Sequence, residues 1–289
     1  MSVQIKYLGT ADSTPWPATD VAHSDGLPIR DSGPWITQKH EPLLYYSEIF
    51  NQSMKDKDWT ARVYVDLFAG PGKCLVRENR QDSGVEHLGS PLKALEKHFT
   101  KFIFVERSMA GAQALARRLE AHPKARLVEI WCGDCAEAIH KIEFPKGSLT
   151  LTFIDPTKIA HCPFGLIQTL NAKARSDILV NIPIGTDIKR NFRNYIRQTG
   201  PTSPFSRYLG CDEWTSIGTN TAANFCRGLI EMFEKQLRNL GYQFVGNKHQ
   251  VKGPNNVPLY YLFFASKHQL GEKFWNDALR RLNAPELQL

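Results

Sequence analysis

Short apolar runs alternate with segments of helical periodicity through the first two thirds of the chain. The apolar runs have the length and the β-branched or aromatic content of buried strands. They are "RVYVDLF" (62–68), "FIFVE" (102–106), "ARLVEIW" (125–131), "SLTLTFID" (148–155) and "DILVNIPI" (177–184). Apolar residues three and four positions apart predict helices over 37–54, 90–99, 108–122, 135–142 and 163–173. Strands separated by helices indicate right-handed crossovers and a parallel sheet.

Residues at the starts of two helices predict where these begin. Ser108 is a favourable N-cap, and the helix that follows it is expected to stop before Pro123. Ser90 is predicted to be the N-cap of the helix over 90–99, with Pro91 at its first helical position.

The pattern changes after Pro183. A basic segment and a Gly/Pro/Ser-rich stretch over about 186–220 are predicted as an insertion, followed by an amphipathic helix over 222–241. Two β-rich segments joined by "GPNN" then predict a hairpin that completes the sheet, and a helix ends the chain. The predicted fold class is α/β: a doubly wound, mostly parallel, Rossmann-like sheet with a C-terminal antiparallel strand pair.

The domain organisation follows from composition. Residues 1–34 are rich in Pro, Asp, Ser and Gly and lack periodicity, so they are predicted to form a tail or a strap over the domain. Residues 35–289 are predicted to form one domain, with insertions near 73–90 and 186–220.

Composition and charge narrow the class of protein. Of the 289 residues, 42% are hydrophobic and 22% are charged, which is typical of a globular protein. The formal net charge of +7 favours a phosphate-bearing partner such as nucleic acid, without requiring one. The chain starts without a secretory apolar stretch, and "YYLFFA" is too short to span a bilayer, so we predict a cytoplasmic protein with no membrane partner. The six scattered cysteines do not resemble a disulfide scaffold.

The segment "YVDLFAGPGKC" (64–74) ends a strand in Asp66 and continues into a loop in which Gly70 and Gly72 permit close backbone approach. A phosphate-binding P-loop would need a different spacing and a hydroxyl residue, and a dinucleotide site would need a third glycine and an immediate helix. S-adenosylmethionine fits best. The acid and the backbone amides of the loop, including the segment at Phe68, can receive its amino-acid head.

Two more acids follow the next strands. Glu106 ends "FIFVE", where an acid accepts hydrogen bonds from ribose hydroxyls. Asp134 in "WCGDC" is predicted to accept a hydrogen bond from the adenine amine, with the Cys135 N–H beside it. The interval between loop and Glu106 exceeds the usual ~20 residues, and the polar insertion after Gly72 accounts for the excess. Three ordered positions make this prediction more specific than the loop alone.

Several stretches outside the loop carry a resemblance to a known family. They are "DGLP", "GPW", "GSPLKAL", "FIDP", "PFG" and "FFASKHQLGEKFW", in order over roughly residues 25–280. With "YVDLFAGPG", they resemble methyltransferase-fold proteins and, within these, the three-Cys-motif partner family. The resemblance implies an S-adenosylmethionine-dependent, methyltransferase-like bacterial protein that works with a companion protein bearing a three-cysteine motif. The three cysteines of the family label belong to the companion.

The fourth predicted strand ends in "FIDPTK". Amino-methylating enzymes of this fold have (D/N)PP(Y/F) here, where the acid and the proline carbonyl orient the target amine. Asp155 and Pro156 match this motif and are the predicted catalytic residues. Thr157 and Lys158 replace the second proline and the aromatic residue, which argues against an adenine-type amine as the acceptor. Methyl transfer from a sulfonium mainly requires alignment of donor and acceptor, so a missing base does not exclude activity.

Cysteine offers two other chemistries. Cys162 in "HCP" has the residue type of the nucleophile in covalent pyrimidine methylation, although a partly buried loop cysteine is the simpler interpretation. "CGDC" has the spacing of half a zinc site. A structural zinc ion needs four ligands and the chain has no second pair, so no metal site is predicted.

The segment "DIKRNFRNYIR" (187–197) is a candidate contact for nucleic acid. Its cations are predicted near one side of a helix, where several of them can meet a phosphate backbone together: Lys189, Arg190, Arg193 and Arg197. The alternative is a solvated helix face whose aromatic residues pack on the domain, and the sequence does not decide between the two.

Two functional hypotheses result. The first is an S-adenosylmethionine-dependent methyltransferase that acts on nucleic acid or a ribonucleoprotein component, favoured by the glycine loop and its acids. The second is a methyltransferase-like binding partner of the companion protein with little or no activity, favoured by the altered "DPTK". A nucleotide hydrolase is disfavoured because the P-loop serine or threonine is absent.

Overall fold

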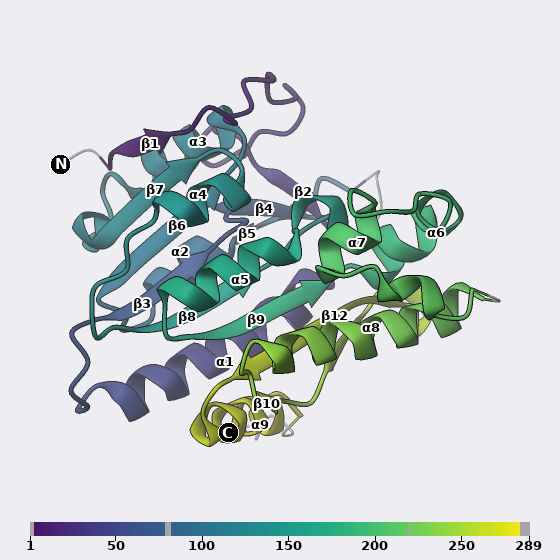
Figure 1. The fold of residues 1–289 in the computed structure, drawn as a ribbon. Helices are drawn as coiled ribbons and strands as arrows, with labels where there is room; N and C mark the ends of the chain where they lie inside the picture. The colour runs from purple at the N-terminus through teal and green to yellow at the C-terminus, as the bar shows by residue number, and fades with distance from the viewer. Residues whose placement is uncertain (1–2, 79–81, 220, 284–289) are drawn as a thin grey trace.

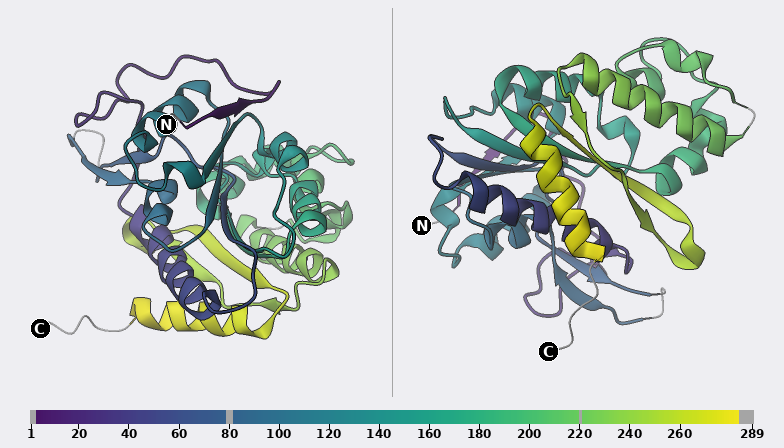
Figure 2. Two further views of the ribbon diagram at one scale, coloured as in Figure 1. Left: turned by 90° about the vertical axis from the view of Figure 1, so that its left-hand side faces the viewer. Right: turned by 90° about the horizontal axis from the view of Figure 1, so that it is seen from below.

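A central sheet crosses the molecule, and helices cover both of its faces (Figure 1, Figure 2). The computed structural model describes residues 3–78, 82–219 and 221–283. Residues 79–81, inside the predicted insertion near 73–90, therefore lie outside the described part of the chain. Within the described ranges, no helix is long and apolar enough to cross a membrane.

The sheet confirms the predicted fold class. Among the described residues it has nine strands in the order β1-β7-β6-β3-β8-β9-β12-β10, with β11 paired to β12. Their bounds are β1 (Ile5–Tyr7), β3 (Arg62–Asp66), β6 (Lys101–Glu106), β7 (Val128–Cys132), β8 (Leu149–Ile154), β9 (Ser176–Ile182), β10 (Phe244–Val245), β11 (His249–Lys252) and β12 (Pro258–Ser266). The strands from β1 to β9 in this order pair in parallel, whereas β12 is antiparallel to β9, β10 and β11. The chain is a doubly wound, mostly parallel, Rossmann-like α/β fold.

The order of the strands reverses beside β3. From β3 the chain moves to β6 and β7 on one side, and it later returns to β8 and β9 on the other. The crossovers leave in opposite directions, so the loops after β3 and β8 diverge and leave a crevice at the carboxyl ends of these strands. The glycine loop and "DPTK" both lie at this crevice.

The helices divide between the two faces. Helices α1, α2, α3 and α9 pack on one face, and α4, α5, α6, α7 and α8 pack on the other. Their bounds are α1 (Ile36–Met54), α2 (Ser90–Leu95), α3 (Met109–Leu119), α4 (Cys135–Lys141), α5 (Phe164–Lys173), α6 (Lys189–Tyr195), α7 (Pro204–Leu209), α8 (Ala222–Asn239) and α9 (Gln269–Asn283). Short helical turns are η1 (Ala125–Leu127), η2 (Ile159–His161), the π-helical η3 (Ile184–Ile188), η4 (Glu213–Ser216) and η5 (Pro254–Asn256).

Two hydrophobic cores result from the alternation of side chains along the strands. In β3, Val63 and Val65 face the core beneath α4, α5 and α8, whereas Tyr64 faces the core beneath α1 and α3. In β6, Phe102 and Phe104 join Tyr64. Successive strand residues point to opposite faces, and a parallel sheet covered on both sides buries both sets.

The N-terminal segment contains more regular structure than its composition predicts. Strand β1 pairs in parallel with β7 at the edge of the central sheet. Strand β2 (Arg30–Ser32) pairs with β4 (Lys73–Val76), which pairs with β5 (Val85–Leu88), and these form a separate three-stranded sheet. Strand β2 is Arg-Asp-Ser and carries no hydrophobic alternation. Around β1, Val3, Ile5 and Tyr7 alternate with polar residues, and this short strand signal was missed by the prediction from composition.

The predicted starts of the two helices have different outcomes. Ser108 is the N-cap of α3, and its side chain accepts a hydrogen bond from the Gly111 N–H, as predicted. The prediction for Ser90 is wrong by one position. Gly89 is the N-cap of α2, because its own N–H donates to Gly72 O at 2.7 Å and holds it in an extended conformation just before the helix.

A tryptophan anchors the closing helix α9 in the core. Trp275 is fully buried, stacks on Phe264 with ring centroids 5.5 Å apart, and donates from Nε1 to Asn247 O at 2.7 Å. We therefore expect Trp275→Ala to lower the free energy of unfolding by about 3–5 kcal/mol, measured by urea denaturation. The control Leu270→Ala changes an exposed residue of the same helix and should have little effect. Equal effects of the two substitutions would contradict this account of how α9 is held.

Candidate functional site

Two adjoining cavities open at the carboxyl ends of the central strands. The strand-end cavity has a volume of about 220 Å³ and contains the predicted Phe68, Glu106, Asp134 and Cys135. The glycine-loop cavity has a volume of about 150 Å³ and contains the predicted Phe68, Gly70, Gly72, Asp155 and Pro156. Phe68, Arg30 and Thr157 line both cavities, so the two meet in one cleft. The fold thus brings the predicted cofactor residues next to the predicted catalytic pair.

An apolar cavity of about 370 Å³ lies at the opposite, amino-terminal ends of the strands, between α1 and α9. Phe50, Trp59 and Phe274 line it together with Asp177, which accepts a hydrogen bond from Tyr46 Oη at 2.6 Å. It contains none of the predicted site residues. Because ligands of open α/β sheets bind at the carboxyl ends of the strands, the cleft formed by the two adjoining cavities is the candidate site.

The glycine loop has a backbone conformation that its glycines make possible. Gly70 and Gly72 have φ angles of 66° and 94°. A Cβ at position 70 would meet no atom within 4 Å, so the backbone there borders open space. A Cβ at position 72 would lie 3.0 Å from Leu115 Cδ1, so α3 closes that side. Positive φ disfavours other residues, and the shape of the loop therefore depends on both glycines.

Asp66 is fully buried beneath the loop and lines neither cavity. Its Oδ1 accepts a hydrogen bond from the Phe68 N–H at 3.1 Å. Burial raises the pKa of Asp66 from 3.8 to about 7, and the nearby Ser90 hydroxyl and the Phe68 N–H offset part of this rise. The contacts make Asp66 a support of the loop, and its direct contact with a cofactor stays a prediction.

Glu106 lies at the end of β6 with one oxygen engaged. Its Oε1 accepts a hydrogen bond from the Ser108 N–H at 2.8 Å, at the start of α3. A Cβ on Gly111 would approach Glu106 Cγ to 3.1 Å, so the helix packs directly against this side chain. The described contacts leave Oε2 available in the strand-end cavity.

Asp134 has a structural role that the sequence interpretation missed. It is the N-cap of α4, and its Oδ1 accepts a hydrogen bond from the Ala136 N–H at 2.8 Å. The Asp134 N–H donates to Thr10 Oγ1 at 2.8 Å. Cys135 is the first residue of the helix, so its N–H has no intrahelical acceptor. Oδ2 of Asp134 and this N–H remain for a ligand.

The predicted catalytic acid is held by residues that the sequence did not single out. Asp155 Oδ2 accepts a hydrogen bond from Lys39 Nζ at 2.5 Å, and Oδ1 accepts one from Asn181 Nδ2 at 2.7 Å. Lys39 Nζ also lies 5.4 Å from the centre of the Tyr260 ring. These three residues come from α1, β9 and β12, so no local motif connects them. The polar Asn181 inside an apolar strand was the available signal.

The basic residues lie on α6 or just after it. The cations are exposed: Lys189, Arg190, Arg193 and Arg197. Phe192 packs against Phe225 with ring centroids 5.2 Å apart, and Tyr195 Oη donates to Asp187 Oδ1 at 2.9 Å. The aromatic residues therefore belong to the packing of the domain, and the cations face solvent. Contact with nucleic acid stays a prediction.

The cysteines near the cleft are buried thiols. Burial raises the pKa of Cys162 to about 12 and that of Cys135 well above its usual value. Such thiols are poor nucleophiles, which favours the simpler interpretation of Cys162 as a loop cysteine. In the described part of the chain, no group of three or more His, Cys, Asp or Glu side chains is placed to hold a metal ion.

Comparisons with known proteins place this geometry among similar folds. No family model matches the sequence, and no curated protein does. A Legionella pneumophila protein of the DUF519 family is 12% identical over 85% of this chain and 91% of its own, with a TM-score of 0.52. The O-methyltransferase TomG of Streptomyces achromogenes, solved with SAM, is 13% identical over 80% and 87% of the two chains, with a TM-score of 0.44. The magnesium protoporphyrin IX methyltransferase of Synechocystis PCC 6803, solved with bound SAH, is 8% identical over 81% and 86%, with a TM-score of 0.42. At these identities the likeness concerns the fold alone.

The raised pKa of Asp66 predicts a dependence of stability on pH. The folded-state pKa of about 7 exceeds the unfolded value of 3.8, so the folded protein binds the extra proton and loses stability as the pH rises from about 4 to 7. We expect Asp66→Asn to remove this loss, which amounts to about 1–4 kcal/mol. The difference in free energy of unfolding between the two proteins, followed by urea denaturation from pH 5 to 8, should grow with pH. The control Asp56→Asn changes an exposed residue and should give a curve parallel to that of the wild type. A curve for Asp66→Asn that also runs parallel to the wild type would show that folding does not raise the pKa of Asp66.

Proposed function

We propose that this protein is an S-adenosylmethionine-dependent methyltransferase whose acceptor is nucleic acid or a ribonucleoprotein component. The observation that carries the proposal is the shared cleft at the strand-order reversal. It combines a glycine loop that borders open space with acids at the ends of the next two strands. Its residues suit a nucleoside with an amino-acid head, because they offer backbone amides and carboxylates.

The donor would be held along the cleft in three parts. The Gly70–Gly72 backbone, supported by Asp66, would receive the methionine part. Oε2 of Glu106 would accept from the ribose hydroxyls, and Asp134 Oδ2 with the Cys135 N–H would bind the adenine edge. When bound, S-adenosylmethionine supplies an electrophilic methyl group. The chain then has to align the acceptor and exclude water.

Asp155 and Pro156 would form the wall on which the acceptor rests. Lys39 neutralises Asp155, and Asn181 fixes its orientation, so the acid is a preformed anchor rather than a free base. An acceptor that hydrogen-bonds to Asp155 has to share its oxygens with these two residues or displace one of them. The Tyr260 ring beside Lys39 provides an aromatic surface that the altered "DPTK" motif lacks.

Nucleic acid is the favoured acceptor class because cations gather beyond the cleft. Lys189 of α6 and Arg227 of α8 line a groove of about 340 Å³ beside Tyr261. Arg190 and Arg193 extend this exposed basic surface along α6. Clustered cations attract a phosphate backbone independently of sequence.

The alternative is a methyltransferase-like partner of a companion protein with a three-cysteine motif, in a bacterial cytoplasm. The observation that favours it is the engagement of both Asp155 oxygens in internal contacts. Transfer of a labelled methyl group into RNA, DNA and protein fractions of the source cell, with and without the companion, separates the two functions. A P-loop function is disfavoured by the structure of "GPGK", because Lys73 pairs with Asp25 at 3.0 Å and Glu86 at 3.3 Å.

The donor site predicts the effect of one substitution. S-adenosylmethionine should bind with micromolar affinity, and Glu106→Ala should weaken binding at least about tenfold. Loss of a double hydroxyl contact to a carboxylate costs about 1.5–3 kcal/mol. Titration calorimetry measures both values, and Glu120→Ala at the exposed end of α3 is the matched control. Equal affinities of wild type and Glu106→Ala would remove Glu106 from the site.

The basic surface makes a separate prediction. The affinity for nucleic acid should fall as salt rises, and Arg190→Ala combined with Arg193→Ala should reduce the slope of log K against log salt by about 1–2. When a phosphate contact is lost, fewer counterions are released on binding, and the slope becomes smaller. Fluorescence anisotropy at several salt concentrations measures the slope. Lys55→Ala with Lys57→Ala, two exposed cations after α1, should leave it unchanged. The same slope in all three proteins would mean that α6 is a solvated surface only.

A further inference from the structure

The N-terminal segment, residues 8–35, forms one wall of the cleft, and we call it the strap. Asp12, Trp16 and Arg30 line the strand-end cavity opposite Glu106 and Asp134, and Arg30 continues into the glycine-loop cavity. Nothing in the proposed donor site so far uses these strap residues. The strap is therefore part of the cleft and not a loose tail.

The strap is docked on the ends of the strands that carry the two acids. The Asp12 N–H donates to Arg107 O at 2.9 Å, next to Glu106, and the Leu8 N–H donates to Cys132 O at 2.8 Å, at the end of β7. A Cβ on Gly133 would lie 2.6 Å from Leu8 Cβ, so only glycine leaves room for the strap at this point.

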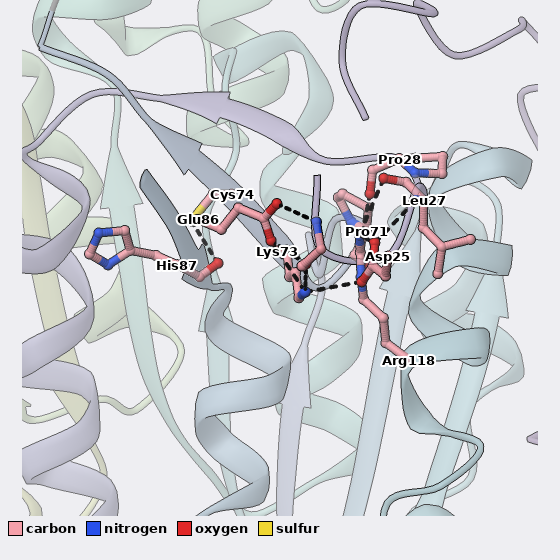
Figure 3. Close-up of polar contacts among 10 residues, drawn as sticks. Asp25, Leu27, Pro28, Pro71, Lys73, Cys74, Glu86, His87 and Arg118 are labelled. Carbon is pink, nitrogen blue, oxygen red and sulfur yellow. Dashed lines mark hydrogen bonds and ion pairs between the residues drawn. The ribbon is translucent and has the colours of Figure 1, made fainter. Parts of the chain in front are cut away.

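A buried arginine joins the strap to the glycine loop (Figure 3). The Arg118 side chain on α3 is only 4% exposed. Its Nε and Nη2 donate to the two oxygens of Asp25 at 2.9 Å each, and its Nη1 donates to Pro28 O at 2.7 Å and to Pro71 O at 2.6 Å. Asp25 and Pro28 belong to the strap, whereas Pro71 lies between the two glycines of the loop. One guanidinium group thus fixes both segments.

A second cation supports the same contact. Lys73, directly after the loop, pairs with Asp25 at 3.0 Å and with Glu86 at 3.3 Å, and Glu86 accepts a hydrogen bond from the Ser24 N–H at 3.0 Å. Burial opposes ionisation of Asp25, but the hydrogen bonds from Arg118, the Leu27 N–H and Lys73 together outweigh it and keep its pKa below the usual value. The clamp of Asp25, Lys73 and Arg118 is therefore closed throughout the physiological pH range.

Two strap residues, Arg30 and Trp16, line the cleft. The Arg30 guanidinium makes no ion pair among the described residues, although it borders both cavities. Trp16 is oriented by a hydrogen bond from its Nε1 to Asp20 O at 2.9 Å. A free guanidinium suits a carboxylate, and an indole ring offers a flat surface to a nucleobase.

We propose that Arg118 is a positioning residue that couples the strap to the glycine loop, so that Arg30 and Trp16 of the strap complete the donor site. Arg30 meets the carboxylate of the donor's amino-acid head, and Trp16 lies against its nucleoside. The inference rests on the proposed function, because it requires that the donor binds in this cleft. It assigns the strap a role in binding that a purely structural cover would not have.

The sequence offers a direct probe of strap position. Arg30 is the single Lys or Arg between Lys6 and Lys39, so trypsin can cut the strap only at the Arg30–Asp31 bond. The test measures the rate of this cleavage by mass spectrometry, with and without S-adenosylmethionine, and the donor affinity by calorimetry. Cleavage after Lys101, in the central β6, reports global unfolding and serves as the internal reference.

The variants separate coupling from simple support. Arg118→Lys keeps the charge but cannot reach Asp25, Pro28 and Pro71 together, and Asp25→Asn removes the ion pair while keeping the side-chain shape. Both should speed cleavage at Arg30 and weaken donor binding by about fivefold or more, with cleavage after Lys101 unchanged. Compared with Asp25→Asn, Asp25→Glu should retain part of the resistance to cleavage at Arg30 and part of the donor affinity. Arg117→Gln, an exposed neighbour of Arg118 on α3, should change neither.

The outcomes distinguish this inference from the proposed function. In wild type, the donor should slow cleavage at Arg30, and Arg30→Ala or Trp16→Ala should weaken donor binding by a similar factor. Faster cleavage in Arg118→Lys and Asp25→Asn with wild-type donor affinity would overturn the inference and leave the function standing. So would unchanged cleavage in both variants. Absence of donor binding by the wild-type protein would overturn the proposed function itself, and the inference with it.

Discussion

The reversal of strand order at β3 is the constraint on which the rest of this structure depends. Crossovers that leave β3 and β8 in opposite directions cannot cover the carboxyl ends of these strands, so a crevice remains between them. Polar groups at the ends of several central strands then gather near one place. Asp66, Glu106, Asp134 and Asp155 are far apart in the chain, and they lie together because each follows a strand of this sheet.

The electrostatics of the crevice are largely settled within the protein. Asp155 is paired with Lys39, and Asp25 is paired with Arg118 and Lys73, so these acids are held charged and oriented. Asp66 has no such partner, and its burial raises its pKa to about 7. A paired acid is a fixed anchor, whereas an unpaired buried acid can change its charge when a cationic group arrives. Asp155 in the cleft is therefore held charged by a partner, whereas Asp66, buried beneath the glycine loop, has no ion-pair partner among the described residues.

The two functional alternatives involve the same part of the cleft. A methyl acceptor and a protein partner would both meet the outer wall of the cleft, where Lys39 covers Asp155 and the Tyr260 ring lies beside it. A partner that draws Lys39 away would free one oxygen of Asp155 for an acceptor. Dependence on a companion and catalytic activity are then compatible properties of one site.

The sequence by itself predicted five central parallel strands, the helices between them and the positions of the strand-end acids. These follow from local periodicity and from the rule that parallel strands present their carboxyl ends at one edge. It also predicted the loop at Gly70 and Gly72, because glycine tolerates the positive φ that other residues disfavour.

The tertiary structure alone decided which of these groups remain free to bind. Lys39, Asn181 and Arg118 reach the cleft from distant elements, and no spacing in the chain announces such contacts. The short strands β1 and β2 were not predicted either, because each has only three residues and is ordered by the strand it joins, β7 or β4. Side-chain pairing across the fold depends on how surfaces meet, and one-dimensional patterns hold no information about that.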